Sequence, residues 1–100
     1  AVAAGVALER GLARRVVIVD WDIHHGNGTQ QLFYDDGRVL YVSIHRFGDR
    51  WYPETGDIDD VGEASGSGFT LNIPWPADNM SDSDYLAAFD LVVLPVITAF

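Results

Sequence analysis

The sequence predicts an α/β fold in which a mainly parallel sheet is flanked by helices. Four consecutive β-branched residues at 16–19 show no alternation with polar residues, which is typical of a strand buried on both faces of a parallel sheet. A second apolar segment, residues 39–44, predicts another strand, and a helix-forming segment precedes each of the two. The order helix, strand, helix, strand is the pattern of a parallel sheet with right-handed crossovers.

The N-terminal segments carry their own boundary signals. Residues 1–12 are rich in alanine and predict the last turns of a helix, with Gly11 as its C-terminal cap. Residues 29–35 suit a second helix that starts at Asn27 or Thr29. An Asp-Gly pair then predicts a turn before the second strand.

A long irregular segment follows the second strand. Residues 47–68 hold five glycines, one proline and six acidic residues, and they predict a loop of a length that is usually functional inside a compact domain. Residues 69–73 alternate between apolar and polar and predict a third strand, which we expect Pro74 to end.

The C-terminal segment predicts a helix. Ser81 and Asp84 have the spacing of a capping box, with Asp as a shorter substitute for Glu. Apolar residues over 85–96 follow helical spacing. Pro95 should kink that helix, because proline lacks the N–H that the helix interior uses.

The composition argues against several classes of function. The chain has 100 residues, no lysine, six arginines and a formal charge of −9, so it offers no basic face for nucleic acid or anionic lipid. No apolar run approaches the roughly 18–20 residues that span a bilayer. Cysteine is absent, so any transition metal must be held by histidine and carboxylate side chains.

Both ends of the chain interrupt a pattern. Residue 1 lies within a helical segment, and Phe100 follows VVLPVITA without a cap or a polar tail. A strand buried on both faces needs helices on both sides of its sheet. We therefore expect residues 1–100 to be an internal fragment of one larger domain; the alternative is a complete small domain with frayed ends.

Chemically active side chains gather directly after the first strand, in the run DWDIHHGN over residues 20–27. Ligands of open parallel sheets bind beyond the carboxyl ends of the strands. In extended backbone, alternate residues share a face, so Asp20, Asp22 and His24 are expected on one side. Asp22 and His24 can then reach a common zinc ion at roughly 2.0–2.2 Å.

The neighbouring residues have simpler interpretations. Gly26 and Gly28 let the backbone turn sharply and approach a ligand. Trp21, Ile23 and His25 share the opposite face, and we expect the first two to be core contacts. His45 is expected to be structural or to support a site residue. The acids at Asp57, Asp59 and Asp60 are expected to form a solvated loop.

One stretch of the sequence resembles a known family. VDWDIHHGNGTQ (19–30) is similar to the zinc-dependent histone deacetylases, and Asn27-Gly28 resembles their class II branch, since class I members usually have Asp-Gly there. The resemblance continues through LYVSIHRF (40–47), WYPETGD (51–57), VGEASGSGFTLNIPW (61–75) and DYLAAFDLVVLPVITAF (84–100), so that it spans the chain. It implies the three-layer arginase/deacetylase-like fold.

The resemblance implies two kinds of metal cofactor, Zn²⁺ and K⁺. It makes Asp22 and His24 two of three zinc ligands. It implies a potassium ion beneath the zinc, held by the side chains of Asp20, Asp22 and Ser43 and by the carbonyls of His24 and Ile44. It also implies a second potassium site that takes the carbonyls of Phe33 and Val39.

Further roles follow from the same resemblance. Asp20 would hydrogen-bond one of a pair of catalytic histidines and fix its tautomer, and Asn27 would stand beside the second. Because an amide is neutral, Asn27 should support an imidazolium less well than a carboxylate would. Tyr52, with Gly26, would line the narrow channel for the acyl-lysine chain.

The implied activity is zinc-dependent hydrolysis of the acetyl-lysine amide to lysine and acetate. In the family, the histidine pair, the third zinc ligand and a transition-state tyrosine fall outside residues 1–100, so this chain alone is expected to be inactive and its parent active. The implied partners are an acetyl-lysine protein, histone or other, and a corepressor complex. The implied setting is intracellular, in nucleus or cytoplasm, with a role in chromatin and transcription regulation.

Three alternatives stay open. A related amidohydrolase of acetylpolyamines or small acyl amides would share the zinc cluster. A haloacid-dehalogenase-type phosphatase also has a strand that ends in Asp-x-Asp, but it expects Thr or Val where His24 stands. A non-catalytic deacetylase-like scaffold would keep the fold and use the acidic loop for partner binding.

Overall fold

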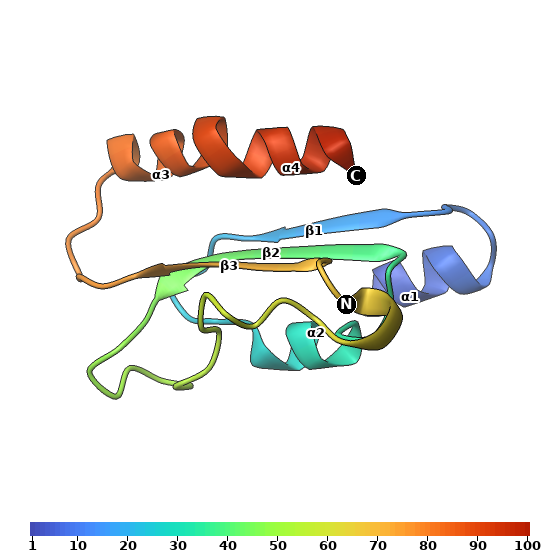
Figure 1. Cartoon of the computed structure of the whole chain (residues 1–100), viewed down its shortest axis with the longest axis horizontal. Helices are drawn as coiled ribbons and strands as arrows, with labels where there is room; N and C mark the ends of the chain where they lie inside the picture. Colours follow the sequence, from blue (N-terminus) through green and yellow to red (C-terminus); the bar gives the residue numbers. More distant parts are fainter.

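A computed structural model describes all residues from 1 to 100 and has three layers, with a sheet between helices (Figure 1). The elements are, in order, α1 (Val2–Glu9), β1 (Val16–Asp20), α2 (Asn27–Leu32), β2 (Val39–Arg46), η1 (Ala64–Gly66), β3 (Thr70–Trp75), α3 (Asp82–Ala88), η2 (Phe89–Val93) and α4 (Leu94–Ala99). The segments α3, η2 and α4 cover one face of the sheet, and α1, α2 and the long loop lie on the other. The predicted α/β class with a parallel sheet and flanking helices is confirmed.

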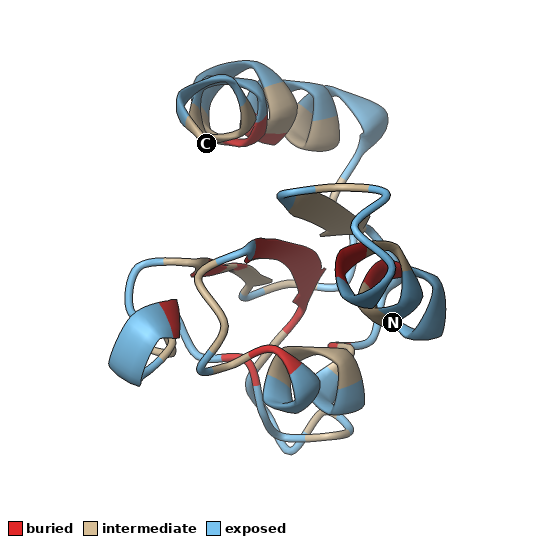
Figure 2. Cartoon of the chain, turned by 90° about the vertical axis from the view of Figure 1, so that its right-hand side faces the viewer, coloured by how far each residue is buried: buried red, intermediate tan, exposed pale blue.

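β2 is the middle strand of the sheet. The strand order is β1-β2-β3, and both pairs are parallel. All of β2 is buried, whereas β1 is half-buried along its whole length (Figure 2). The prediction that the first strand is covered on both faces is confirmed, since Val17 and Val19 pack against the core of the C-terminal helical segments and Val16 and Ile18 against the core that contains α1. Its burial is partial because β1 pairs with a neighbour on one side only.

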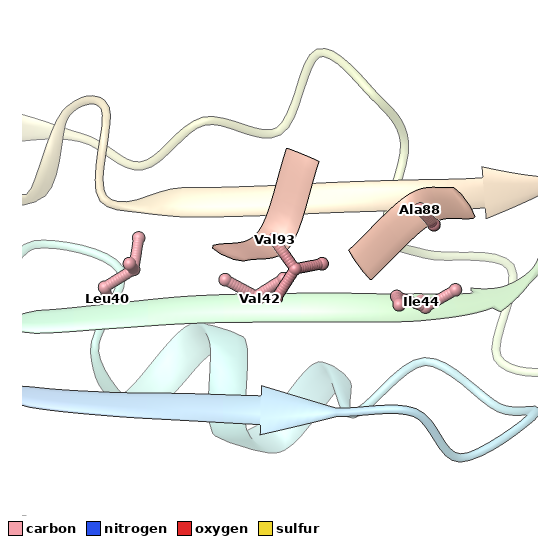
Figure 3. Close-up of a cluster of buried hydrophobic side chains, with 5 residues drawn as sticks. All are labelled: Leu40, Val42, Ile44, Ala88 and Val93. Atoms are coloured by element: carbon pink, nitrogen blue, oxygen red, sulfur yellow. The ribbon is translucent and has the colours of Figure 1, made fainter. Parts of the chain in front are cut away.

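Alternate residues of β2 pack against different helical layers. Leu40, Val42 and Ile44 are buried against Ala88 and Val93 of the C-terminal helical segments (Figure 3). The residues between them point to the opposite side of the sheet, since a strand alternates its side chains. Ser43 and His45, at the carboxyl end of β2, are consequently on the side of α2 and the long loop.

The second core holds α1 against that opposite side. Val39 packs with Phe33 and with two residues of α1, Ala4 and Leu8. Gly11 has a φ of +66°, and its N–H donates to the Leu8 carbonyl at 3.1 Å while the next residue bonds to the Ala7 carbonyl at 2.8 Å. This left-handed cap ends α1 as predicted.

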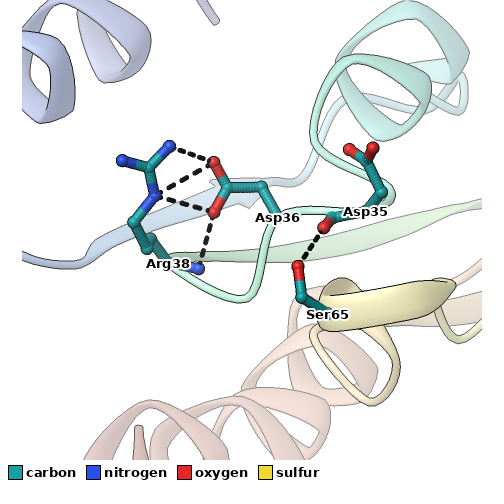
Figure 4. Close-up of polar contacts among 4 residues, drawn as sticks. All are labelled: Asp35, Asp36, Arg38 and Ser65. Atoms are coloured by element: carbon teal, nitrogen blue, oxygen red, sulfur yellow. Dashed lines mark hydrogen bonds and ion pairs between the residues drawn. The ribbon is translucent and has the colours of Figure 1, made fainter.

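The helix after the site is shorter than predicted. α2 begins at Asn27, but its cap position is Gly26, and neither expected side chain makes a cap hydrogen bond. It ends at Leu32 because turns follow: the Asp36 N–H donates to the Phe33 carbonyl at 3.1 Å. The Asp36 carboxylate then accepts hydrogen bonds from the backbone and guanidinium of Arg38, while Ser65 ties η1 to the Asp35 carbonyl (Figure 4).

Two proline expectations are corrected. β3 continues through Pro74, which pairs with His45 in the register; β3 pairs on one side only, and an edge strand tolerates the missing N–H. Pro95 lies in the first turn of α4, directly after the π-helical turn η2. The wider turn of η2 accommodates a residue that lacks an N–H, and the helical segments continue along one direction (Figure 1).

The remaining boundaries agree with expectation. The Ser81 N–H donates to the Asp84 carboxylate at 2.7 Å at the start of α3, as the capping box predicts. The long segment after β2 is irregular apart from the short helix η1. None of the helices is both long enough and apolar enough to span a membrane.

Candidate metal centre

The candidate site lies at the carboxyl ends of β1 and β2. Asp20 is the last residue of β1 and is paired with Ser43 of β2 in the parallel register. After Asp20 the backbone bends instead of continuing as a strand. The Asp22 N–H donates to Asp20 Oδ1 at 3.1 Å, and the His24 N–H donates to Asp22 Oδ1 at 2.8 Å. Two successive Asp side chains thus fold the chain into consecutive turns.

These turns bring Asp22 and His24 together. Asp22 Oδ1 and His24 Nδ1 are 3.5 Å apart, and the side chains are 68% and 48% exposed. Ligands about 2.0–2.2 Å from a tetrahedral zinc ion are separated by about 3.3–3.6 Å. The pair therefore has the separation of one edge of a zinc tetrahedron, although turns and not an extended strand produce it.

The donor set is suited to a metal ion but incomplete within the chain. One carboxylate oxygen and one imidazole nitrogen are ligands that zinc accepts. No group of three or more histidine, aspartate or glutamate side chains is gathered closely enough to hold an ion. Residues 1–100 thus bring together two side chains of the kinds that bind zinc.

Two aromatic residues of the long loop flank His24. The Trp51 ring is stacked on the His24 imidazole with centroids 5.1 Å apart and an interplanar angle of 12°. Tyr52 meets the same imidazole edge-on at 6.2 Å and 66°. Tyr52 is largely exposed, which suits a channel wall. The contact between Trp51 and His24 was not predicted. The only signal in the sequence is that Trp51 directly precedes Tyr52, the expected channel residue.

The other two histidines of the chain, His25 and His45, lie together in the interior next to the site. His25 and His45 are 4% and 0% exposed, with ring centroids 4.7 Å apart. His45 Nε2 donates to the Gly56 carbonyl at 2.9 Å, and His45 Nδ1 is 2.8 Å from the Ser43 hydroxyl. His45 therefore ties the Gly56 loop to Ser43 of β2, and these contacts agree with both expected roles, structural or supporting a site residue.

His25 is equally enclosed. Its Nδ1 is 2.8 Å from the Thr55 hydroxyl and its Nε2 is 2.9 Å from Gln30 Oε1. Burial lowers the pKa of His25 and of His45, against weaker opposing contributions from hydrogen-bond partners. Both rings are thus neutral at neutral pH, each with one nitrogen accepting and one donating.

Tyr41 fixes the glycine turn beside Asp20. The Tyr41 hydroxyl donates to the Gly26 carbonyl at 3.2 Å, and burial raises the pKa of Tyr41 to about 12. A Cβ atom at Gly26 would lie 2.7 Å from Asp20 Oδ2 and 2.7 Å from the Tyr41 hydroxyl. The backbone at Gly26 thus lies close to Asp20 and Tyr41, and its approach to a ligand stays a prediction. Gly28 lies inside α2 with open space around its Cβ position, so the sharp turn expected there is wrong.

The other expected ligands are placed as follows. The hydroxyl of Ser43 is hydrogen-bonded to His45. The side chain of Ile44 packs into the helical core, so only its backbone carbonyl could serve as a ligand. Phe33 and Val39 are buried together, and the Phe33 carbonyl accepts the Asp36 N–H. Asn27 is exposed at the start of α2. Their metal and partner roles stay predictions.

Two further expectations are corrected. Asp60 is not simply solvated: its carboxylate accepts the Asp57 N–H at 3.1 Å and the Gln30 amide at 3.4 Å. Gln30 Oε1 also accepts from Asn72 at 2.9 Å. Trp21 and Ile23 are 63% and 42% exposed and so are not core contacts in this chain, because the backbone no longer alternates after Asp20.

Comparisons with known proteins agree along the whole chain. A family model described as histone deacetylase domain matches residues 1–100. Histone deacetylase HDA1 of Candida albicans is 59% identical over 90 residues, which cover 87% of this chain and 11% of that protein. Histone deacetylase 15 of Arabidopsis thaliana is 52% identical over 101 residues, which cover 100% of this chain and 18% of that protein.

Solved structures give the same result. The structure of the histone deacetylase Clr3 matches with a TM-score of 0.94 and 52% identity, over 98% of this chain and 17% of that one. The HDA15 HD domain matches with a TM-score of 0.93 and 46% identity, over 99% of this chain and 28% of that one.

The chain spans 11% to 18% of the length of the two curated relatives. The matched relatives and structures are histone deacetylases, and they agree with the class II-like resemblance. The three-layer arginase/deacetylase-like arrangement is confirmed by the structural matches. Residues 1–100 belong to the histone deacetylase family.

Proposed function

We propose that residues 1–100 form part of the catalytic domain of a zinc-dependent protein lysine deacetylase. The observation that carries the proposal is the approach of Asp22 and His24 to 3.5 Å, at the carboxyl ends of parallel strands, in a chain that matches the deacetylase domain throughout. The parent hydrolyses the acetyl-lysine amide, and this chain alone supplies too few groups for turnover.

Asp22 and His24 would hold the zinc ion. When bound there, zinc polarises the acetyl carbonyl and lowers the pKa of a water molecule towards about 7. Asp20 and Asn27 would orient catalytic histidines supplied from outside the chain. Tyr52 and Gly26 would line the channel for the acyl-lysine chain; the exposure of Tyr52 beside His24 supports this role.

Potassium is proposed at two sets of oxygen donors. Asp20 and Ser43 are register partners on the same side of the sheet, and they are proposed to bind K⁺ together with Asp22 and the carbonyls of His24 and Ile44. The Phe33 and Val39 carbonyls are proposed for a second ion. Oxygen-rich donor sets of this kind suit hard cations.

The biological setting is proposed from the family alone. The substrate is an acetylated protein, histone or other. The parent acts in chromatin and transcription regulation, in nucleus or cytoplasm, within a corepressor complex.

The test uses the complete deacetylase domain that contains this chain. We expect Asp22→Ala and His24→Ala each to lower kcat/KM for an acetyl-lysine peptide by about 100-fold or more and to lower the bound zinc. Asp90→Ala removes an exposed carboxylate on the far helical layer and should change neither. Unchanged turnover and zinc content in both site variants would refute the assignment of the ligands.

A further inference from the structure

Trp51 covers one face of the imidazole that the proposed function uses as a zinc ligand. We propose that Trp51 is a positioning residue that fixes the ring plane of His24, and this inference rests on the proposed function. The two rings are nearly parallel, with an interplanar angle of 12° and centroids 5.1 Å apart. A stacked aromatic neighbour limits the rotation of the imidazole about its side-chain bonds.

His24 needs such a neighbour because hydrogen bonds do not hold its ring. Histidine ligands of metals are commonly oriented by a hydrogen bond from the second ring nitrogen to a carboxylate or carbonyl group. The neighbouring His25 has hydrogen-bond partners on both nitrogens. His24 bonds only through its backbone N–H, and its ring has just the 3.5 Å approach to Asp22. Trp51, with the edge of Tyr52, therefore defines its orientation.

The turn that presents Trp51 is locally costly. Asp49 and Arg50 have φ values of +50° and +59°, a left-handed conformation that is unfavourable for residues other than glycine. The indole N–H of Trp51 is buried without a hydrogen-bond partner, which costs about 1–3 kcal/mol for a typical buried donor. Such local costs persist where the surroundings enforce them, and they cluster at functional sites.

The surroundings that enforce this turn begin at the sheet. Arg46, the last residue of β2, is almost fully buried and pairs with Asp49 at 3.0 Å. The backbone N–H of Trp51 donates to the Gly48 carbonyl at 2.9 Å and closes the turn. The middle strand of the sheet thus fixes Asp49, the closed turn fixes Trp51, and Trp51 covers His24.

The test compares Trp51 with Trp75 in the complete domain. Both tryptophans are half-buried and have a buried, unpartnered indole N–H, but Trp75 packs edge-on against Tyr85 of α3. We expect Trp51→Leu to raise the zinc dissociation constant by about 10- to 100-fold and to shift the visible absorption of the Co²⁺-loaded protein. Trp51→Phe should largely restore both, and Trp75→Leu should lower only the Tm.

A second pair of variants tests the Arg46–Asp49 ion pair without changing a buried side chain. Asp49 and Asp78 both pair with Arg46, and their side chains are 88% and 79% exposed. Only Asp49 belongs to the turn before Trp51. We expect Asp49→Ala to weaken zinc binding a few-fold, and Asp78→Ala to leave it unchanged.

The outcomes separate this inference from the proposed function. If the Trp51→Leu and Asp49→Ala variants bind zinc as tightly as the unsubstituted domain and leave the Co²⁺ spectrum unchanged, Trp51 is merely structural and the inference fails. If Asp22→Ala and His24→Ala also keep zinc and activity, the proposed function itself fails. Loss of zinc in those two variants with normal binding in Trp51→Leu refutes the positioning role alone.

Discussion

His24 and His25 are adjacent in sequence and lie in opposite environments. His24 is half-exposed beside Asp22, and its ring lacks hydrogen bonds. His25 is buried, and both of its ring nitrogens are bonded. The difference arises because the chain leaves the sheet at Asp20 and then turns, so that one imidazole faces the open end of the sheet and the next faces the loop beneath it. Adjacent positions in the sequence thus hold a candidate ligand, His24, and a buried histidine, His25.

The largest expected effect on stability comes from a substitution that crowds the buried His25 and His45 rings. Gly56 and Gly68 share a φ of +86°, but a Cβ atom at Gly56 would lie 2.5 Å from His45 Nε2 and 2.6 Å from the His25 ring, whereas Gly68 faces open space. We expect Gly56→Ala to lower the free energy of unfolding by about 4 kcal/mol or more, and Gly68→Ala by about 1–2 kcal/mol from backbone strain alone. Urea unfolding of the complete domain measures both, and equal losses would show that the histidine pair does not constrain the loop.

A smaller effect distinguishes the two histidines directly. His25→Leu leaves the Thr55 hydroxyl without its imidazole partner and removes one of the two hydrogen bonds that Gln30 Oε1 accepts, and we expect a loss of about 1–3 kcal/mol in the free energy of unfolding. His24→Leu changes an exposed side chain, so we expect less than about 1 kcal/mol in the presence of a chelator. Equal destabilisation by the two substitutions would contradict the contrast between them.

The smallest expected effect is a pH dependence of stability. Burial lowers the folded pKa of His25 and His45, whereas an unfolded histidine has a pKa near 6.5. The unfolded chain therefore binds more protons, and the free energy of unfolding should fall as the pH drops below about 6.5, by at most about 1.4 kcal/mol per pH unit for each histidine. The Tm of the metal-free domain between pH 5 and 7.5 measures this slope.

One variant makes that measurement specific. His25→Leu should reduce the slope by removing one of the two buried groups. An unchanged slope in His25→Leu would contradict the assignment of the pH dependence to the buried histidine pair.

Local patterns sufficed for several elements. The apolar run at 16–19, the Gly11 cap and the capping box at Ser81 each act within a few residues, so the sequence predicts β1, the end of α1 and the start of α3. The deacetylase motif likewise identified Asp22 and His24 as a pair. The strand end at Pro74 and the helix kink at Pro95 were mispredicted because sheet edges and a π-helical turn, which are not local signals, decide whether a proline is tolerated.

By itself the sequence determined the α/β class and the family, and it singled out Asp22 and His24 as a candidate zinc pair, because apolar patterns and motif residues are local features of the chain. Only the tertiary structure decided that Trp51 covers His24, that Arg46 anchors its turn, and that His25 and His45 pack together under Gly56. Apart from the Arg46–Asp49 ion pair, whose residues are three positions apart, these contacts join segments far apart in the chain. They depend on how the long loop folds back over the sheet, and no periodicity of a single segment records that path.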